Sequence, residues 1–262
     1  MKTKVAVFGA GGRMGAEVCR AVAADPELEL VAAVDPHHAG LDLRQVTGVD
    51  LPIQLGASAE QLAHADPDVA VDFTQLEASR QNLAWLAEHG VHAVVGTTGF
   101  TDADYARFEA TFTRSNCVIA PNFAIGAVLM MRFAELAAPY FESAEIIELH
   151  HENKIDAPSG TAMHTAERMA AASDAWAPDP TTNTVLDGAR GGRDVGGIPI
   201  HSVRVRGLVA HQEVILGTTG QTLTIRHDTT DRTSFMPGVV LAVKAVGDRP
   251  GVTIGLEDLL DL

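Results

Sequence analysis

The chain has little cysteine, few aromatic side chains and little positive charge. Only 2 of its 262 residues are cysteines, and 5 % are Phe, Trp or Tyr. Cys19 falls in a helix-like run and Cys117 at the start of an apolar, strand-like run. Cysteines in such places are expected to be small buried hydrophobic residues rather than a disulfide or a redox pair. The sequence gives no sign of a disulfide framework, and a reducing cytoplasm is the expected compartment.

Acidic residues outnumber basic ones, since 34 Asp and Glu face 19 Lys and Arg for a net charge of -15. This charge opposes binding to nucleic acid or to an anionic membrane surface, so we expect neither partner. No apolar run approaches the ~20 residues that cross a bilayer. The N-terminus enters a strand-like run without the charged and then apolar segment of a secretion signal. A chain of this length can bury the core of one large or two modest domains.

The first part of the chain alternates between short β-type runs and amphipathic helical runs. The strand-like runs are residues 5–8, 30–34, 69–73, 92–95 and 117–120. The helix-like runs are residues 14–24, 59–64, 76–88 and 102–112. This alternation predicts a Rossmann-like α/β fold, in which a doubly wound parallel sheet carries helices on both faces. Ligands bind such sheets at the carboxyl ends of the strands, so we expect the loops 72–74, 96–99 and 120–123 to line a cofactor cleft.

After residue 122 the pattern changes to that of an α+β region with a mixed or antiparallel sheet. Its predicted elements are helices over 125–141 and 161–172, and strands over 144–150, 200–208, 211–216 and 222–227. The last three runs are interpreted as antiparallel strands. A helix over 235–246 should pack back on the first domain, because it needs an apolar partner. We therefore expect a dinucleotide-binding domain of residues 1–121 with 231–262, and a substrate-binding and oligomerisation domain of residues 122–230.

Residues 9–15 form a glycine-rich turn, G-A-G-G-R-M-G, between the first strand-like run and the first helix-like run. Glycine permits a tight turn and lets the backbone approach a pyrophosphate at the start of a helix. The match to G-x-G-x-x-G is imperfect, because Met14 occupies the third glycine position and Gly15 follows it. The second apolar run ends at Asp35, where an acid would bond the ribose hydroxyls. The turn and the acid together predict dinucleotide binding.

Residues 148–162 read E-L-H-H-E-N-K-I-D-A-P-S-G-T-A. His150 and His151 are of the residue type that most often serves as a general acid or base near neutral pH, and Lys154 follows them closely. Gly160 and Thr161 would open a helix whose free backbone N–H groups can hold an anion. Proton donors, a cation and a carboxylate cradle in one segment predict an active site for an acidic small molecule.

Plainer interpretations of this segment stay open. The histidines could be half-exposed residues at a strand end, Lys154 a solvated surface charge, and Ser159 an ordinary helix cap. A metal site is not expected, because adjacent histidines on a strand point to opposite faces and Ile155 stands where the H-E-x-x-H motif needs its second histidine. The glycines between residues 188 and 197 indicate a flexible loop, because no strand precedes them and no G-K-[ST] ending follows.

Over essentially its whole length, the sequence resembles the 4-hydroxy-tetrahydrodipicolinate reductase family, also called dihydrodipicolinate reductase. The segment 148–161 looks like the highly specific signature of that family, and residues 9–15 look like its cofactor turn. The loops 96–99 and 120–123 look like its nicotinamide-side loops. The resemblance implies NAD(P)H-dependent reduction of 4-hydroxy-tetrahydrodipicolinate to tetrahydrodipicolinate with loss of water, a step of diaminopimelate and lysine biosynthesis. It also implies a homotetramer built from the antiparallel strands of the second domain.

The resemblance implies roles for individual residues as well. His150 is the proton donor and acceptor, and Lys154 is a second proton donor. The residues that hold the dicarboxylate substrate are His151, Ser159, Gly160 and Thr161. The residues that hold NADH or NADPH are Gly9, Ala10, Gly11, Gly12, Arg13, Met14, Asp35, Gly96, Thr97, Thr98, Ala120, Pro121, Asn122 and Phe123.

One departure bears on the choice of cofactor. Many members place an arginine directly after the acid of the second strand, where it meets the 2′-phosphate of NADPH. Here Pro36, His37 and His38 follow Asp35. An acid without that arginine favours ribose hydroxyls and repels a phosphate, so we expect NADH to serve at least as well as NADPH.

Three alternatives remain open at this point. A related two-domain amino-acid dehydrogenase of the aspartate type would need a different signature from that of residues 148–161. A non-catalytic dinucleotide-binding sensor would keep residues 9–15 but would not need His150 and Lys154 together. The third alternative is a purely structural homologue.

Overall fold

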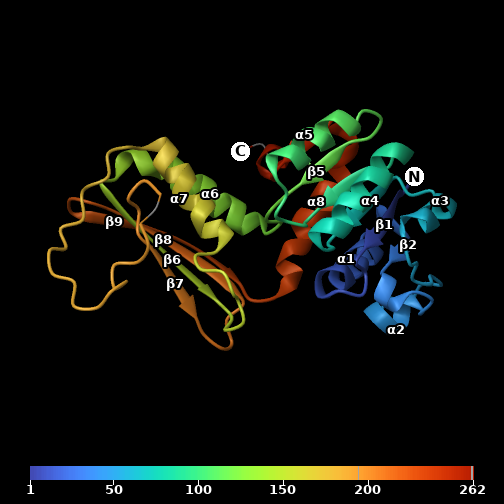
Figure 1. Cartoon of the computed structure of the whole chain (residues 1–262), viewed down its shortest axis with the longest axis horizontal. Coiled ribbons are helices and arrows are strands. Elements are labelled where there is room, and N and C mark those ends of the chain that lie inside the picture. Colours follow the sequence, from blue (N-terminus) through green and yellow to red (C-terminus); the bar gives the residue numbers. More distant parts are fainter. Residues whose placement is uncertain (194, 261) are drawn as a thin grey trace. The chain divides into compact units, whose positions relative to one another are not determined.

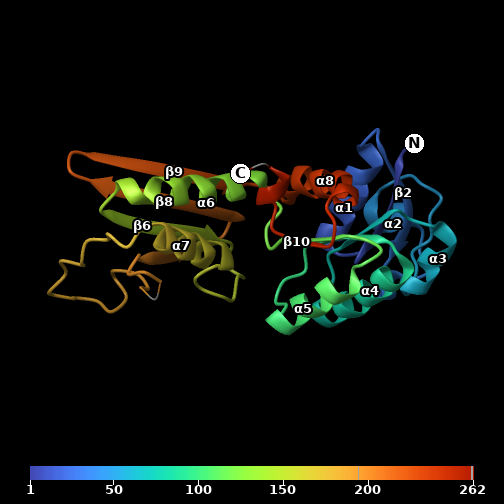
Figure 2. The same cartoon turned by 90° about the horizontal axis from the view of Figure 1, so that it is seen from above.

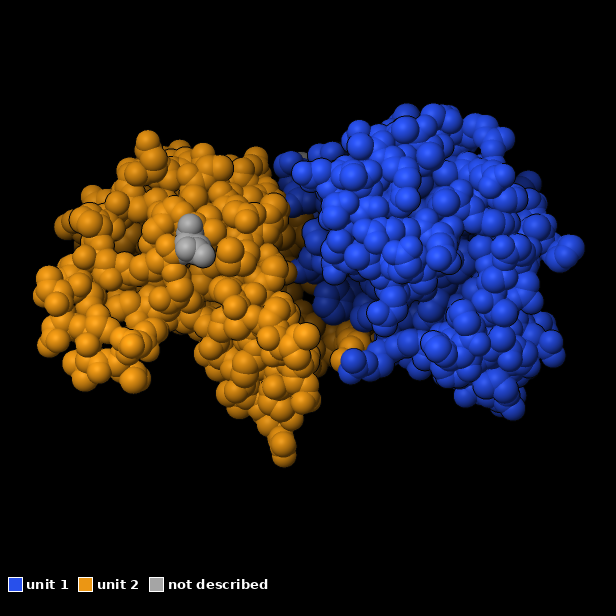
Figure 3. Space-filling view, viewed as in Figure 1, with its two compact units in different colours: residues 1–123, 235–262 blue, residues 124–234 orange. Residues whose placement is uncertain are grey.

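The computed structural model describes residues 1–193, 195–260 and 262. The chain divides into two compact units, residues 1–123 with 235–262 and residues 124–234 (Figure 3). The boundaries expected from the sequence, at 121/122 and 230/231, lie a few residues before these. They stay a prediction about where independently folding domains begin and end.

The first unit contains a six-stranded sheet in which every neighbouring pair of strands is parallel (Figure 1). The strand order is β10-β5-β4-β3-β1-β2. The strands are β1 (Thr3–Phe8), β2 (Leu28–Val34), β3 (Val69–Asp72), β4 (His92–Val95), β5 (Cys117–Ile119) and β10 (Val252–Ile254). The chain runs from β1 outward to β2 and then returns to β3 on the other side. The order therefore reverses between β1 and β3, which is where open α/β sheets bind their ligands.

Helices cover both faces of this sheet. Figure 2 shows α1 and α8 on one side of it and α4 and α5 on the other. Leu83 and Leu86 of α4 and Phe108 of α5 are buried in the core that also contains Phe8 of β1. The predicted Rossmann-like fold is thereby confirmed. The helices of this unit are α1 (Arg13–Ala24), α2 (Leu43–Thr47), α3 (Leu62–Ala65), α4 (Leu76–His89), α5 (Asp102–Thr111) and α8 (Met236–Ala245).

The second unit contains a four-stranded mixed sheet in the order β7-β6-β8-β9. Its strands are β6 (Ser143–His150), β7 (Ile200–Arg204), β8 (Ala210–Thr218) and β9 (Gln221–Thr229). The helices α6 (Ile125–Ala137) and α7 (Gly160–Ala172) contribute to one core with this sheet. Ile146 of β6, Met169 of α7 and Leu216 of β8 are buried in that core. The expected second region with a mixed sheet is thus confirmed.

Three details of the sequence prediction were wrong. The run expected over 200–208 ends at Arg204 and does not pair with the next run. It pairs in parallel with β6 instead, because a connection containing α7 carries the chain back to the same end of the sheet. The helix expected over 125–141 ends at Ala137 and continues as a 3₁₀ turn, since Pro139 has no N–H to extend the ladder. The short edge strand β10 was missed, because three residues carry no readable period.

Side chains of β6 alternate between the core and the other face of the sheet. Ala144, Ile146 and Glu148 point into the core, and the residues between them are half-buried. The alternation of β6 therefore places Glu148 on the core-facing side, at the position that follows the apolar residues Ala144 and Ile146. Among the helices that the structure describes, none is long and apolar enough to cross a membrane.

Candidate active site

The glycine-rich turn lies directly after β1 and leads into α1. Gly9 has a φ of 72°, and its N–H donates to the carbonyl oxygen of Val34 at 2.8 Å. Gly12 precedes α1, which begins without a side-chain cap and without an acidic residue in its first turn. The first N–H groups of the helix are therefore left for an anionic ligand, which fits the pyrophosphate of a dinucleotide.

Gly15 explains the imperfect glycine motif. A Cβ atom at this position would collide with the carbonyl oxygen of Gly9, so only glycine lets the first turn of α1 pack on the loop. Close packing of helix on loop is the role of the third glycine in dinucleotide-binding turns. In this chain Gly15 fills that role, one residue later than the motif places it, and Met14 is left half-buried beside it.

Asp35 follows β2 and faces the glycine turn. Its Oδ2 accepts a hydrogen bond from the backbone N–H of Gly11 at 2.9 Å. Its Oδ1 accepts one from the N–H of His37 at 3.0 Å and lies 3.1 Å from Nδ1 of His38. The structure thus joins the predicted acid to the predicted turn. Arg13, at the first position of α1, is exposed.

The loops after β3, β4 and β5 lie together at the carboxyl edge of the sheet. Buried Asp72 accepts a hydrogen bond from the hydroxyl of Thr97 at 3.0 Å, and the same hydroxyl contacts the carbonyl oxygen of Thr74 at 3.0 Å. The rings of Phe73 and Phe123 lie 5.6 Å apart. The positions expected to hold the cofactor differ in exposure, with Thr97, Ala120 and Phe123 buried and Thr98 and Pro121 exposed.

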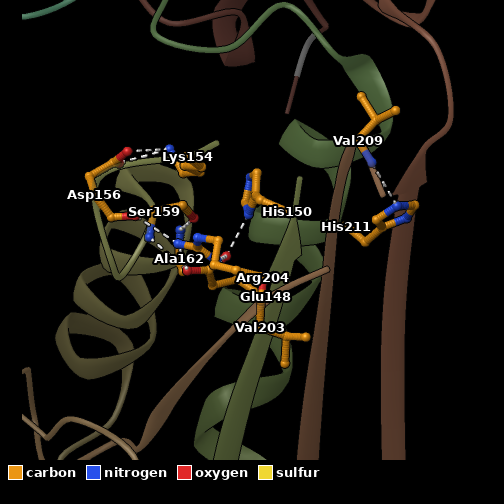
Figure 4. A network of polar contacts seen from close by, with 10 residues as sticks. All are labelled: Glu148, His150, Lys154, Asp156, Ser159, Ala162, Val203, Arg204, Val209 and His211. Atoms are coloured by element: carbon orange, nitrogen blue, oxygen red, sulfur yellow. Dashed lines mark hydrogen bonds and ion pairs between the residues drawn. The ribbon is translucent and has the colours of Figure 1, made fainter. Parts of the chain in front are cut away.

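In the second unit, His150 is the last residue of β6 and lies against Glu148 (Figure 4). Its Nδ1 is 2.5 Å from Oε2 of Glu148. Residues two apart on a strand share a face, so the alternation of β6 brings the two side chains together. An ionised carboxylate only accepts hydrogen bonds, so Nδ1 carries the proton and Nε2 is left to exchange one with a ligand.

Arg204, the last residue of β7, pairs with the same carboxylate. Its two terminal nitrogens donate to Oε2 and Oε1 of Glu148 at 2.8 and 2.7 Å, in the forked geometry that suits a guanidinium and a carboxylate. Burial would raise the pKa of Glu148, but the hydrogen bonds from His150 and Arg204 outweigh burial and lower it from 4.5 to about 2. Glu148 is therefore an anion throughout the physiological pH range.

The loop after β6 turns back and presents Lys154. The backbone N–H of Lys154 donates to the carbonyl oxygen of His151 at 3.2 Å. The ammonium group binds both carboxylate oxygens of Asp156 at 2.8 Å, and this hydrogen bond lowers the pKa of Asp156. Lys154 is thus a paired cation at the edge of the site rather than a freely solvated one. His151, directly after β6, is half-buried.

The start of α7 completes the group. The hydroxyl of Ser159 caps the helix by accepting a hydrogen bond from the N–H of Ala162 at 3.2 Å. The N–H of Ser159 in turn donates to Oε1 of Glu148 at 3.2 Å. Gly160 is exposed, and the first turn of α7 holds no acidic residue, so this helix start can accept an anion.

The structure therefore places His150, His151, Lys154 and the 159–161 turn between the end of β6 and the start of α7, as one segment. The sequence prediction missed Glu148 and Arg204 as members of the site. Glu148 carried a readable signal, because an acid at a buried position of an alternating strand needs a cation. Arg204 carried none, since 56 positions separate it from Glu148. Among the described residues, no group of three or more His, Cys, Asp or Glu side chains could hold a metal ion.

Comparison with known proteins gives consistent matches over the whole chain. The family model described as dihydrodipicolinate reductase, N-terminus, matches residues 3–123, and the model for its C-terminus matches residues 126–260. The 4-hydroxy-tetrahydrodipicolinate reductase of Mycolicibacterium vanbaalenii is 53 % identical over 99 % of this chain and 99 % of the relative. The enzyme of the same name from Streptomyces coelicolor is 50 % identical over 100 % of this chain and 99 % of that relative.

Solved structures agree with these matches. The dipicolinate-bound dihydrodipicolinate reductase of Paenisporosarcina sp. TG-14 has a TM-score of 0.86 and 40 % identity, with 98 % of this chain and 99 % of that chain covered. The amine dehydrogenase of Mycobacterium smegmatis has a TM-score of 0.67 at 15 % identity, with 97 % of this chain and 95 % of that chain covered. The second likeness shows a shared fold alone.

Proposed function

Because the chain belongs to the dihydrodipicolinate reductase family, we propose that it reduces 4-hydroxy-tetrahydrodipicolinate to tetrahydrodipicolinate with loss of water, as a step of diaminopimelate and lysine biosynthesis. The protein is an oxidoreductase, and NADH or NADPH would supply the hydride when bound. The observation that carries the proposal is the group formed by His150, Lys154 and the start of α7. It offers proton donors and anion-binding N–H groups in one segment of the second unit.

His150 acts as the proton donor in this proposal. Hydride addition to a cyclic imine places negative charge on the conjugated system, and a proton must be delivered near neutral pH. The Glu148 carboxylate holds Nδ1 of His150, which leaves Nε2 as the nitrogen that gives the proton. Lys154 is a second proton donor, and releasing Asp156 would free its ammonium group to approach the substrate.

The substrate carries two carboxylates, and the start of α7 suits one of them. Gly160 and Thr161 lie in the first turn of α7, Ser159 shapes the turn, and His151 follows the last residue of β6. These groups place positive potential in a chain whose net charge is -15. A local anion site is needed to bind a dicarboxylate against that field.

Pyridine-2,6-dicarboxylate tests this carboxylate site. It is planar and carries two carboxylates, and the solved relative from Paenisporosarcina sp. is described as dipicolinate-bound. We expect it to inhibit competitively with the substrate and to leave the apparent KM of the nicotinamide cofactor nearly unchanged. Inhibition competitive with the cofactor alone would place the dicarboxylate site wrongly.

The cofactor is proposed to bind the first unit along the edge where β1, β3, β4 and β5 end. Gly9 to Met14 and the start of α1 hold the pyrophosphate, and Asp35 holds the ribose. The loops 96–98 and 120–123 hold the nicotinamide. We propose that NADH serves at least as well as NADPH, because Asp35 can bond the ribose hydroxyls but repels a 2′-phosphate. His37, His38 and exposed Arg13 soften that repulsion, so we expect a preference for NADH rather than exclusion of NADPH.

We further propose that the protein is a cytoplasmic homotetramer whose subunits meet through the sheet of the second unit. One face of that sheet packs on α6 and α7. Ile147, Leu149 and Ile215 alternate with the core residues, so they lie on the other face, where they remain half-buried. Sedimentation of the purified protein measures the oligomeric state. A monomer at micromolar concentration would contradict the proposed homotetramer.

A purified-protein assay tests the reaction. NADH absorbance is followed while the substrate is generated from pyruvate and aspartate semialdehyde. We expect NADH oxidation that requires both precursors. We expect no reduction of NAD⁺ when aspartate is supplied in the reverse direction. Activity with aspartate alone would favour an aspartate-type dehydrogenase, and cofactor binding without turnover would favour a sensor. The variant H150Q is the control that ties turnover to the proposed site.

A further inference from the structure

Glu148 is a buried carboxylate that three separate segments contact. Its side chain is fully shielded from solvent, on the face of β6 that otherwise packs against α7. It accepts hydrogen bonds from His150, from both terminal nitrogens of Arg204 and from the backbone N–H of Ser159. The Ser202 hydroxyl, opposite it on β7, donates to it as well. A buried charge is costly unless all its lone pairs are satisfied, and here they are.

These contacts join the parts of the site to one another. Arg204 also donates to the carbonyl oxygen of Asp156 at 2.7 Å, and Asp156 is the partner of Lys154. Ser159 is the cap of α7, where the proposed carboxylate cradle begins. The Glu148 carboxylate thus connects the proposed proton donor, the loop of the second donor and the start of the cradle (Figure 4).

A purely structural ion pair would not need the histidine. Buried ion pairs can often be replaced by apolar residues without loss of stability, so stability alone does not account for a charge at this position. The contact with His150 has a chemical consequence instead. A carboxylate at Nδ1 fixes the neutral tautomer with its proton on Nδ1 and stabilises the imidazolium, as an acid does for the base in catalytic triads.

We propose that Glu148 is a positioning residue for proton transfer, which orients the His150 imidazole with Nε2 toward the substrate and ties that orientation to the loop carrying Lys154. The inference rests on the proposed role of His150 as proton donor. Glu148 itself exchanges no proton with the substrate. Arg204 keeps it anionic while His150 gains and loses its proton.

The charged neighbours of His150 determine which residues the test must substitute. On β7 the residue opposite His150 is Arg204, and on β8 it is Ala210, which carries no charge. In the loop beyond, Lys154 and Asp156 form a pair of opposite charges. Removing Glu148 alone therefore leaves His150 beside an unpaired guanidinium, whereas removing Glu148 and Arg204 together leaves no net change of charge.

The test uses two variants and a matched control in the purified full chain. E148Q replaces the anionic acceptor of Nδ1 with a neutral amide that can also donate, and E148Q/R204M removes both buried charges so that neither is left unpaired. E145Q is the control, because Glu145 lies on the same strand and accepts a histidine and an arginine as well, His201 and Arg190, each at 2.6 Å. E145Q should keep kcat within threefold of the unmodified protein.

We expect E148Q and E148Q/R204M to lower kcat by at least roughly 10²-fold, with a smaller change in KM. The pH profile of kcat should differ between E148Q and the unmodified protein, because the anion no longer stabilises the imidazolium. The ¹⁵N spectrum of the histidine side chains should show that His150 loses its preference for the Nδ1–H tautomer. E148D, which keeps the charge on a shorter side chain, should recover part of kcat and the original pH profile.

Three results would overturn the proposal while the function stands. They are a kcat within threefold of the unmodified protein in E148Q, recovery of kcat in E148Q/R204M, or an unchanged tautomer. Recovery in the double variant would mean that Glu148 only neutralises Arg204. Full activity of H150Q is a different result, because it would remove His150 from the proposed function as well. The double variant also keeps the test open if E148Q alone does not fold.

Discussion

The two units each hold a buried carboxylate at their candidate site, and they hold it differently. Among the described residues, Asp35 in the first unit is contacted by two backbone N–H groups and one imidazole, and by no guanidinium or ammonium group. Glu148 in the second unit is clamped by the fork of Arg204 and by His150. The backbone donors to Asp35 are neutral, and its Oδ2 accepts from the N–H of Gly11, so a ligand hydroxyl can still approach this oxygen. Both oxygens of Glu148 already accept hydrogen bonds from Arg204, and further ones from His150 and Ser159, so no acceptor capacity is left for a ligand.

This difference suits the two carboxylates to different roles, ligand selection for Asp35 and positioning of partner side chains for Glu148. A carboxylate held by neutral donors can select a ligand, because a hydroxyl can still approach it and a phosphate is still repelled. A carboxylate held by cations positions its partners and takes no direct part in binding. Changes at Asp35 should therefore alter which cofactor is used, whereas changes around Glu148 should alter how fast the reaction proceeds.

The largest effect is expected at His150. H150Q removes the proposed proton donor and should lower kcat by roughly 10²–10⁴-fold. The Kd of the cofactor should stay nearly the same, because the proposed cofactor site lies in the first unit. Steady-state kinetics and cofactor titration measure the two quantities. A kcat within threefold of the unmodified protein would remove His150 from the mechanism. A weaker cofactor affinity at unchanged kcat would contradict the proposal that the first unit binds the cofactor and the second unit transfers the proton.

Loss of the clamped carboxylate should also destabilise the fold. E148Q leaves Arg204 buried without its partner and should lower the free energy of unfolding at pH 7 by about 3–5 kcal/mol. E145Q, which loses a partly exposed pair, should cost less than about 1 kcal/mol. Urea unfolding of both variants measures the difference. Equal costs would mean that burial of Glu148 does not matter.

The pH dependence of this effect has a definite sign. The pKa of Glu148 in the folded state is lowered from 4.5 to about 2, since hydrogen bonds from His150 and Arg204 outweigh its burial. Its contribution to stability is therefore complete above pH 4.5 and is lost as the pH falls through about 2. The gap between E148Q and the unmodified protein should narrow below pH 4.5. A gap that stays constant down to pH 2 would contradict the assigned pKa.

The sequence predicted the features that depend on neighbours along the chain. The glycine turn, the acid after β2 and the segment 148–161 are each local, and their local conformation follows from glycine, alternation and helix capping. Features that depend on distant residues were not predictable. The pairing of Arg204 with Glu148 requires β7 to lie parallel to β6, and the sequence pattern of β7 does not state its direction.

A substitution of Gly15 tests the proposed pyrophosphate site of the first unit. A Cβ there would collide with the Gly9 carbonyl, so G15A should move the turn, raise the Kd of the cofactor and cost about 1–3 kcal/mol of stability. Gly247 is the matched control, because a Cβ there meets nothing within 4 Å. Isothermal titration and thermal unfolding compare G15A with G247A. Equal cofactor affinity in the two variants would mean that the turn does not hold the pyrophosphate.

The smallest effect concerns the choice of cofactor at Asp35. In the unmodified protein, kcat/KM for NADH should be at least equal to that for NADPH, and a tenfold preference for NADPH would contradict the assignment.

D35N removes the negative charge but keeps a polar group of the same size. One charge at contact distance in water contributes about 1 kcal/mol, so the ratio of kcat/KM for NADPH to that for NADH should rise roughly fivefold. E29Q removes an exposed acid from β2, the strand that Asp35 follows, and should leave the ratio unchanged. Because the effect is electrostatic, it should shrink as salt is raised from 0.05 to about 0.5 M, where screening shortens the reach of a charge. A ratio that E29Q changes as much as D35N would mean that net charge, rather than the position of Asp35, sets the preference.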